Sequence, residues 1–539
     1  MSTPKPNLIK VLVTTLALTL IVFSVALAAV VDGVDVKVTH DNNNVDGGVP
    51  NPSFDSRNRQ QNETTIAISP ADTDIVATGA NDYRMVPVTA DVWFGFSVSD
   101  DGGTTWFETF VPGFPSDTSP AGLASPLLGL DASGDPVVRF DRQGNLYAAG
   151  IGFNRNFDQP DRPVDTLVYV AKYNFTPGTP GGTSTPNSAA NPPNFTYAGT
   201  TVVDRGAVGF AVPGVIGFAG DFTDKEWMEI DLNSASASQC AGNVYVAYTS
   251  FHGAFGNSPI KFNTSTDGGV TFGQSKGIST GGADGTPMNQ GADIAVAPNG
   301  TIYIAYAAFQ RGAQGGSSIG VVKSTDCGKH WSQPVLIASI SDPQAPGLAF
   351  RTPTFAFISV DDTNPDTVYV AYQNFTGGDY DIFVRRSTDG GVTWGSAVQV
   401  NEDPGARHQV FPTIDIADGV LHVAWYDARN SATPGNEALD VFYAYTTPAT
   451  FPAFSANERV SDVSHNPNCL LFGGGTVAFH GDYIELDAIE AGGTHTVHVS
   501  WADNRDVTPC DLDPAPGPAS GNTGNRNANI YADTLTVTP

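Results

Sequence analysis

Apolar and polar residues alternate in short runs along most of the chain, and Asn, Gly, Asp and Pro bound these runs. A period of two closed by turn residues predicts β-strands joined by tight turns. One unit, a strand, a turn and a second strand, recurs seven times. The copies lie at residues 66–81, 137–150, 228–248, 294–306, 357–372, 414–425 and 484–501. No apolar stretch of helical period follows the N-terminal region, so we expect an all-β protein.

A second pattern, S-x-D-x-G-x-x-aromatic, follows several of these units. It occurs at residues 99–106, 265–272, 324–331 and 387–394. The spacing predicts a tight hairpin turn in which the Asp carboxylate accepts from turn N–H groups and Gly supplies a positive φ. The aromatic residue is expected to pack beneath the turn. Each repeat then holds four strands, an up-and-down pair followed by a second pair.

Four-stranded units repeated around an axis predict a β-propeller. We count seven blades, and six blades with one unit outside the ring is the alternative. The seventh unit ends after residues 528–537 without a fourth strand, whereas residues 34–39 alternate like a strand. We therefore expect residues 29–57 to contain a strand that closes the ring, and residues 58–539 to form one propeller domain.

The first 28 residues differ from the rest. Lys5 and Lys10 precede an apolar run, and Ala26-Leu27-Ala28 resembles a cleavage site. This pattern predicts a signal peptide cut before Ala29, and an uncleaved membrane anchor is the alternative. Under either interpretation, the rest of the chain is exported.

The four cysteines fit an exported chain and allow three pairings. We favour Cys240–Cys327 and Cys469–Cys510, each of which joins neighbouring segments, and free thiols are the alternative.

The composition narrows the classes of ligand that the protein could bind. The chain has 55 Asp and Glu against 26 Lys and Arg, a net charge of −29. A nucleic acid ligand is excluded as the main partner, since a phosphate backbone needs a basic face. No cofactor is predicted. Residues 41–47 place oxygen ligands at calcium-like spacing but lack the terminal Glu of a full loop, so calcium is an alternative only.

The four S-x-D-x-G turns resemble Asp-boxes, also called bacterial neuraminidase repeats, which typify sialidase-like propellers. The resemblance implies a propeller whose Asp-boxes lie away from the catalytic face. In that family three arginines hold the substrate carboxylate, a Tyr activated by a Glu attacks the sugar, and an Asp is the acid/base. Residues 350–353, FRTP, resemble the motif of the first arginine, although they follow three Asp-boxes. Arg351 is therefore either a substrate ligand or an arginine paired with a neighbouring acid.

Three Asp-x-Arg motifs end second strands and contain Arg84, Arg429 and Arg505. An Asp two residues before an Arg can fix the guanidinium by a charge-assisted hydrogen bond. These arginines either form a set of positioned cations at one end of the ring or staple their own loops. Because the motif repeats, we favour the staple.

The first strand of each blade should line the axis. Aligning the seven copies gives one apolar column, and the next position points to the opposite face of the strand. That second column reads Ala67, Arg139, Glu229, Ala295, Ser359, Asp415 and Glu485. Structural pairing with Arg139 is the favoured explanation of its charges. Tyr483 lies on the same face as Glu485, two residues away, which resembles a nucleophile and its base.

The sequence thus predicts a secreted or cell-surface sialidase-like propeller that acts on or binds extracellular carbohydrate or glycoprotein as a monomer. As an exo-glycosidase it would use Tyr483, Glu485, Asp415 and Glu229 as catalytic residues and Arg351, Arg429 and Arg505 as substrate ligands. The alternative is a non-catalytic propeller that serves as an interaction scaffold. Whether the chain is an enzyme is left open, and no metal ligand is predicted.

Overall fold

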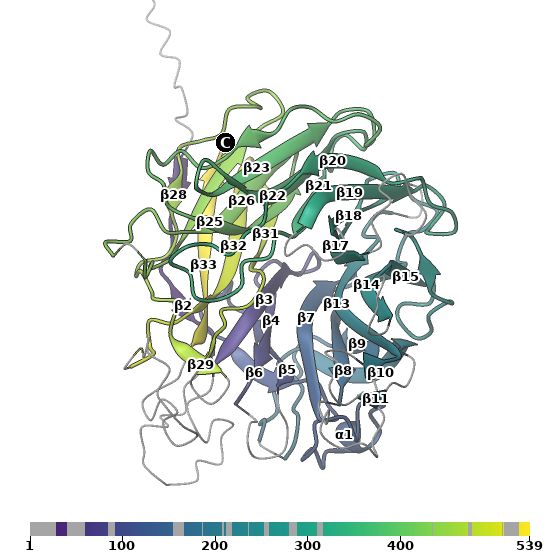
Figure 1. The fold of residues 1–539 in the computed structure, drawn as a ribbon. Coiled ribbons are helices and arrows are strands. Elements are labelled where there is room, and N and C mark those ends of the chain that lie inside the picture. Colours follow the sequence, from purple (N-terminus) through teal and green to yellow (C-terminus); the bar gives the residue numbers. More distant parts are fainter. Residues whose placement is uncertain are drawn as a thin grey trace, which may run out of the picture.

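The computed structural model describes residues 29–39, 60–84, 92–154, 166–185, 187–206, 210–211, 218–234, 237–252, 258–279, 288–309, 316–433, 435–472, 477–508, 510 and 528–539. Within them the chain forms seven antiparallel sheets of four or more strands, set side by side around an axis (Figure 1). The first strand of each blade contacts the first strands of the blades on both sides, and the contacts close a ring. The prediction of a seven-bladed β-propeller is confirmed, and the six-bladed alternative is wrong.

The first four blades follow the chain in order. Blade 1 contains β3 (Gln61–Ile68), β4 (Val76–Asp82), β5 (Trp93–Ser99) and β6 (Phe107–Phe110). Blade 2 contains β7 (Ala132–Phe140), β8 (Leu146–Phe153), β9 (Thr166–Phe175) and β10 (Phe195–Arg205). Blade 3 contains β13 (Asp221–Ile230), β14 (Val244–His252), β15 (Ile260–Ser265) and β16 (Lys276–Gly277). Blade 4 contains β17 (Met288–Val296), β18 (Ile302–Phe309), β19 (Gly316–Ser324) and β20 (Val335–Ser339).

The remaining blades complete the ring. Blade 5 contains β21 (Ala356–Val360), β22 (Val368–Thr376), β23 (Asp379–Ser387) and β24 (Val398–Gln399). Blade 6 contains β25 (Gln409–Ala417), β26 (Val420–Asp427), β27 (Asp440–Thr446) and β28 (Glu458–Arg459). Blade 7 contains β31 (Glu485–Ala491), β32 (Thr494–Asp503) and β33 (Asn529–Thr538). Outside the blades lie the short pairs β11 (Phe210–Ala211) with β12 (Phe218–Ala219) and β29 (Leu470–Phe472) with β30 (Val477–Ala478), and one helical turn, α1 (Pro120–Leu123).

The N-terminal segment completes blade 7. Strands β1 (Ala29–Val31) and β2 (Val36–Lys37) both pair antiparallel with β33. The segment for which the sequence predicts a closing strand therefore contains β2. The predicted signal peptide and the calcium-like run at residues 41–47 lie outside the described residues.

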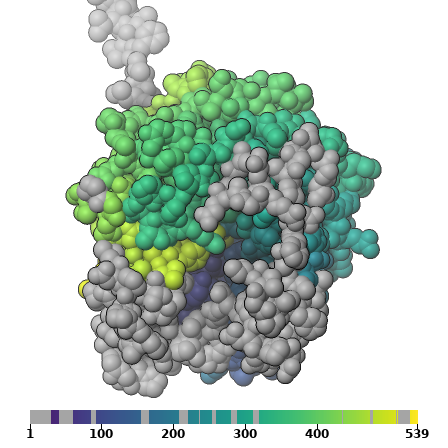
Figure 2. Space-filling view, viewed as in Figure 1, coloured from purple at the N-terminus to yellow at the C-terminus, as the bar shows by residue number. Residues whose placement is uncertain are grey.

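The core lies between the blades. The apolar column predicted from the seven copies is buried in every blade. Its members are Ile66, Val138, Met228, Ile294, Ile358, Ile414 and Ile484. Burying such side chains is the main stabilising contribution of each blade. The space-filling view shows the surface hollowed near the ring centre, between the purple first blade and the yellow last blade (Figure 2).

The S-x-D-x-G turns have the predicted geometry. In the first, Asp101 accepts hydrogen bonds from the backbone N–H and the hydroxyl of Thr105 at 2.8 and 2.7 Å. Gly102 and Gly103 have φ of 68° and 87°. The Trp106 ring is buried and its indole N–H donates to the Gly103 carbonyl at 3.0 Å.

Two disulfides join Cys240 to Cys327 and Cys469 to Cys510, as predicted. The first ties a turn of blade 3 to the S-x-D-x-G turn of blade 4. Disulfides persist in oxidising surroundings, so both are compatible with an extracellular protein. No helix among the described residues combines the length and apolar character that a membrane crossing needs.

Candidate functional site

The two ends of the ring carry different connections. In a four-stranded meander the turns after the first and third strands share one end, and the other connections share the opposite end. The S-x-D-x-G turns lie between third and fourth strands, at what we call the turn end. The inner strands begin at the other end, which we call the mouth.

The inner strands start irregularly at the mouth. In five of them the pairing register shifts beside a residue with positive φ: Glu63, Asp135, Lys225, Gly291 and Phe411. Such backbone costs about 1–3 kcal/mol for a non-glycine residue and persists where its surroundings fix it. Bulges of this kind re-aim side chains next to functional sites.

Charged side chains from several blades gather at these bulges. The mouth cluster, as we call it, consists of Glu63, Asp135, Asp224, Lys225, Glu226, Arg351 and Asp482, and electrostatic interactions connect its members. Glu63 and Glu226 are buried, Asp135 and Asp224 are half-buried, and the Arg351 side chain is 63% exposed. The cluster thus reaches from the protein interior to solvent.

Asp135 and Asp224 form a carboxyl pair within the mouth cluster. Their carboxyl groups interact directly. The backbone N–H of Lys225 donates to Asp135 at 3.0 Å, and the Gln290 amide donates to Asp224 at 3.3 Å. Burial, reinforced by the charge of Asp135, raises the pKa of Asp224 to about 7. A carboxyl group of this pKa can donate a proton near neutral pH.

Arg351 and Lys225 supply the positive charge. Arg351 binds Asp482 bidentately, with Nε and Nη2 at 2.8 and 2.6 Å from its carboxylate oxygens. The Lys225 ammonium lies 3.7 Å from Asp482 Oδ2 and 3.7 Å from the centre of the Tyr483 ring. In the described part of the chain, neither this ammonium nor the buried Glu226 carboxyl group has a hydrogen-bond partner. Burial, then the charge of Asp135, raises the pKa of Glu226 well above its usual value.

Tyr483 lies beneath the mouth cluster and is buried. Its hydroxyl donates to the Pro136 carbonyl at 3.4 Å, and burial followed by the charge of Glu63 raises its pKa well above the usual value. Its ring packs edge-on against Trp227, which packs in the same way against Phe357. These three aromatic residues form a layer across the axis.

The other predicted catalytic residues lie beyond this aromatic layer. Glu229, Asp415 and Glu485 line a cavity of about 360 Å³ that Trp227 and Phe357 bound on one side and Leu232 and Pro298 line near the turn end. The Arg139 guanidinium bridges Glu229 and Glu485, with Nε and Nη2 at 3.0 and 2.6 Å from their respective carboxylate oxygens. The structure therefore brings Glu229 and Glu485 together, but it places them on a different side of the aromatic layer from Asp224 and Arg351.

The carboxylates of this cavity also bind backbone. The inner strand of a propeller blade has a free edge, whose N–H groups need acceptors. Glu485 accepts from Ile66 N–H at 2.9 Å, and Asp415 accepts from Ala488 N–H at 3.0 Å. Each of these bonds joins one blade to the next. The charges of this column therefore have a structural function in holding the ring together.

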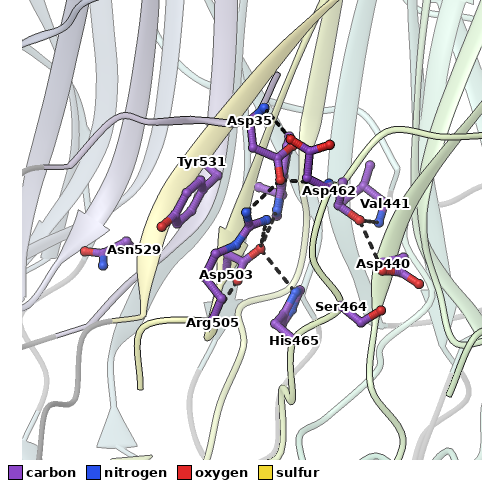
Figure 3. Close-up of polar contacts among 12 residues, drawn as sticks. Asp35, Asp440, Val441, Asp462, Ser464, His465, Asp503, Arg505, Asn529 and Tyr531 are labelled. Atoms are coloured by element: carbon purple, nitrogen blue, oxygen red, sulfur yellow. Dashed lines mark hydrogen bonds and ion pairs between the residues drawn. The ribbon is translucent and has the colours of Figure 1, made fainter. Parts of the chain in front are cut away.

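The arginines of the Asp-x-Arg motifs contact carboxylates and aromatic rings close to them in the fold. Arg429 Nη2 lies 2.7 Å from Asp427 Oδ2, and its guanidinium stacks on Phe442 at 4.1 Å. Arg505 makes the same 2.7 Å contact with Asp503 and stacks on Tyr531 at 4.1 Å (Figure 3). Neither arginine shares a partner with Arg351. The favoured interpretation of the motif as a staple agrees with these contacts.

The sequence prediction missed most of the mouth cluster. The aligned copies do contain a pattern that could have indicated the cluster. Three residues before the apolar column, Glu63, Asp135 and Lys225 occupy the same position of the repeat. The bulges hide it, because an extra residue breaks the alternation of faces at that point. Among the described residues, no group of three or more His, Cys, Asp or Glu side chains is arranged to hold a metal ion.

Comparison with known proteins identifies no family. No family model matches the chain, and no curated protein matches it. Several solved structures are similar in fold. One is a protein of unknown function from Dyadobacter fermentans, 11% identical, with a TM-score of 0.41 over 95% of this chain and 99% of that one. A leech intramolecular trans-sialidase is 14% identical, with a TM-score of 0.41 over 76% of this chain and 72% of its own.

A third similar structure is the α-L-arabinofuranosidase Arb93A from Fusarium graminearum. It is 12% identical, with a TM-score of 0.40 over 78% of this chain and 99% of its own. Similarities this weak assign neither a family nor an activity to the chain.

Proposed function

We propose that this chain is an exported propeller that acts on extracellular glycans as an exo-glycosidase, with the mouth cluster as its site. The observation that carries the proposal is the pair of half-buried carboxyl groups of Asp135 and Asp224, which lies beside the exposed Arg351. Glycoside hydrolysis needs a carboxylic acid of raised pKa that protonates the leaving oxygen, and a second carboxylate nearby.

Each member of the site receives a role from its surroundings. Asp224 is the proton donor, because its pKa of about 7 keeps about half of the molecules protonated there at neutral pH. Asp482 supplies the second carboxylate, which its ion pair with Arg351 fixes in place. The exposed face of Arg351 orients the sugar through hydrogen bonds.

The proposal transfers the acid/base role away from residues predicted from the sequence. Tyr483 precedes β31, which begins at Glu485, and the two side chains have different partners. The Tyr483 hydroxyl donates to Pro136 and Glu485 is bound by Arg139. Glu229 and Asp415 face the cavity toward the turn end. A substrate role for Arg429 and Arg505 would require them to leave their Asp partners.

A non-catalytic scaffold is the second candidate. It is favoured by the structural contacts of the charges predicted from the sequence, since Arg139, Arg429 and Arg505 each bind neighbouring carboxylates. Such a propeller would bind glycans or glycoproteins without turnover.

The test is hydrolysis of a panel of aryl glycosides by the purified mature protein and its variants. Asp224→Asn should lower kcat by about 10²–10⁴-fold, the usual contribution of a general acid. Asp487→Asn is the matched control, because Asp487 is also a half-buried carboxyl of raised pKa but lies in the cavity toward the turn end. Melting temperatures report folding of both variants.

Two further variants separate the assignments. Tyr483→Phe should keep its activity, whereas Arg351→Ala should raise KM. Loss of turnover in Tyr483→Phe with an unchanged melting temperature would restore Tyr483 as the nucleophile. Glycan binding by a wild type that hydrolyses no glycoside would establish the scaffold instead.

A further inference from the structure

The arginines near the mouth side of the blades are engaged by carboxylates of the protein. Recognition of a sugar carboxylate typically uses a guanidinium that offers two parallel N–H groups. Arg351 gives two such groups to Asp482. Arg429 and Arg505 each donate one side-chain N–H, from Nη2, to Asp427 and Asp503 respectively. Arg84 contacts both Asp82 and Glu108, at 2.5 and 2.6 Å.

The charge of the mouth cluster is unfavourable for an anion. Its five acids are Glu63, Asp135, Asp224, Glu226 and Asp482, against the two cations Lys225 and Arg351. Burial raises the pKa of Glu63 and Glu226 well above their usual values. The acids outnumber the cations, so the cluster offers no excess positive charge to an anion.

The polar groups that remain suit hydroxyl groups. The carboxyl groups of Asp135 and Asp224 accept hydrogen bonds when ionised and also donate when protonated, so they suit a sugar hydroxyl. The exposed Arg351 guanidinium donates to hydroxyl oxygens without needing a partner of opposite charge. A carboxylate on the sugar would instead meet the charge of Asp135 or Asp482, which costs affinity by like-charge repulsion.

We infer that the mouth cluster takes an uncharged sugar unit and discriminates against sialic and uronic acids. The inference rests on the proposed glycan-directed function of the same residues, and it specifies the class of substrate. It follows from the engagement of Arg351 by Asp482 and from the charge balance of the cluster.

The experiment uses pairs of aryl substrates that differ only in a carboxylate. Aryl glucoside is compared with aryl glucuronide, and aryl galactoside with aryl galacturonide, in both anomeric forms, together with an aryl arabinofuranoside and an aryl sialoside. The wild-type value of kcat/KM for a neutral member should exceed that of its acidic counterpart at least about 100-fold. Binding of the same free sugars and their oligomers, measured calorimetrically, should show the same order.

The outcomes separate the inference from the proposed function. Turnover or binding of an acidic sugar at a level equal to or above its neutral counterpart overturns the inference and leaves the glycan-directed function standing. If no sugar is either hydrolysed or bound, the proposed function fails and the inference fails with it.

Asp482→Asn provides a charge test of the same idea. It removes the carboxylate that occupies Arg351 and faces Lys225, so glucuronate should bind more tightly relative to glucose than it does to the wild type. Asp487→Asn, which lies in the cavity toward the turn end, should leave that ratio unchanged. An unchanged ratio in folded Asp482→Asn would contradict the charge-balance explanation.

Discussion

Arg505 and Asp35 join opposite ends of the described chain. Arg505 Nη1 lies 2.7 Å from Asp35 Oδ2, and Nη2 lies 2.7 Å from Asp503 Oδ2 (Figure 3). The backbone N–H of Asp35 donates to the Asp462 carboxylate at 3.2 Å, and the backbone N–H of Asp462 donates to the Asp35 carboxylate at 2.8 Å. One guanidinium therefore ties the N-terminal segment to blade 7, and the aspartates tie it to the loop after blade 6.

Replacing Arg505 should weaken this closure. The Arg505 side chain is 12% exposed, and its removal leaves Asp35 and Asp503 buried without their counter-ion. Breaking a buried pair in this way typically costs about 3–5 kcal/mol. Urea unfolding of Arg505→Ala should show this loss, while the exposed Arg142→Ala should unfold like the wild type. Equal stability of the two variants would show that the strand pairing of β1 and β2 closes the ring without the ion pair.

The closure should also weaken as pH rises. Burial raises the pKa of Asp32 to about 7 and that of Asp533 to about 8, and neighbouring acids add to both shifts. The charged groups that face them are Asp35, Glu458 and Asp462, and Arg505 faces Asp35. Both folded pKa values exceed the unfolded value of 3.8, so the folded state binds more protons between about pH 4 and pH 8. The contribution of these groups is therefore present below pH 4 and is lost as pH rises through 7 to 8.

The pH effect is measured as urea unfolding free energy at intervals from pH 5 to pH 8.5. Asp533→Asn should make the decline shallower, because the amide still accepts from the Thr534 N–H but does not ionise. Asp267→Asn is the control: hydrogen bonds from Thr271 lower the pKa of Asp267 to about 2, outside this range. A wild-type slope that Asp533→Asn leaves intact would assign the decline to other carboxyl groups.

The S-x-D-x-G turns should affect stability and not activity. Asp101→Ala removes the acceptor of two Thr105 hydrogen bonds, with an expected cost of about 1 kcal/mol. Thermal unfolding measures this loss. Since the turn lies at the end opposite the mouth cluster, kcat/KM for any substrate found should stay within twofold of the wild type. A selective loss of activity would show that the turn end takes part in the function.

The N-terminal processing prediction can be checked directly. If the signal peptide is cut as predicted, the exported protein begins at Ala29, which is also the first residue of β1. N-terminal sequencing or intact mass of the secreted protein measures this. Retention of residues 1–28 in a membrane fraction would support the anchor alternative.

The fold could be predicted from the sequence because the chain contains a repeat. The column from Ile66 to Ile484 recurs with the strand period, so both the blade count and the buried face followed from alignment. The closing strand followed from a missing partner in the last unit. The register of β1 on β33 was not predictable, because residues 29–31 belong to the apolar run at the N-terminus.

The site was harder to predict because two physical effects run against the strand pattern. At Lys225 and Glu226 the bulge adds a residue, which moves the neighbouring side chains off the face that alternation assigns. Tyr483 precedes β31, so the alternation of faces along that strand does not extend to it. Sequence proximity also gave no indication that Asp135 and Asp224, which belong to different blades, would lie together.

The layer of Trp227, Phe357 and Tyr483 separates the cavity lined by Glu229 and Glu485 from the mouth cluster. A solute that fills this cavity meets the Trp227 and Phe357 rings before it can reach Asp224. The cavity can therefore acquire a ligand of its own, or lose it, independently of the mouth cluster. Widening the cavity by substitution would leave the chemistry of the mouth cluster intact as long as the aromatic layer stays in place.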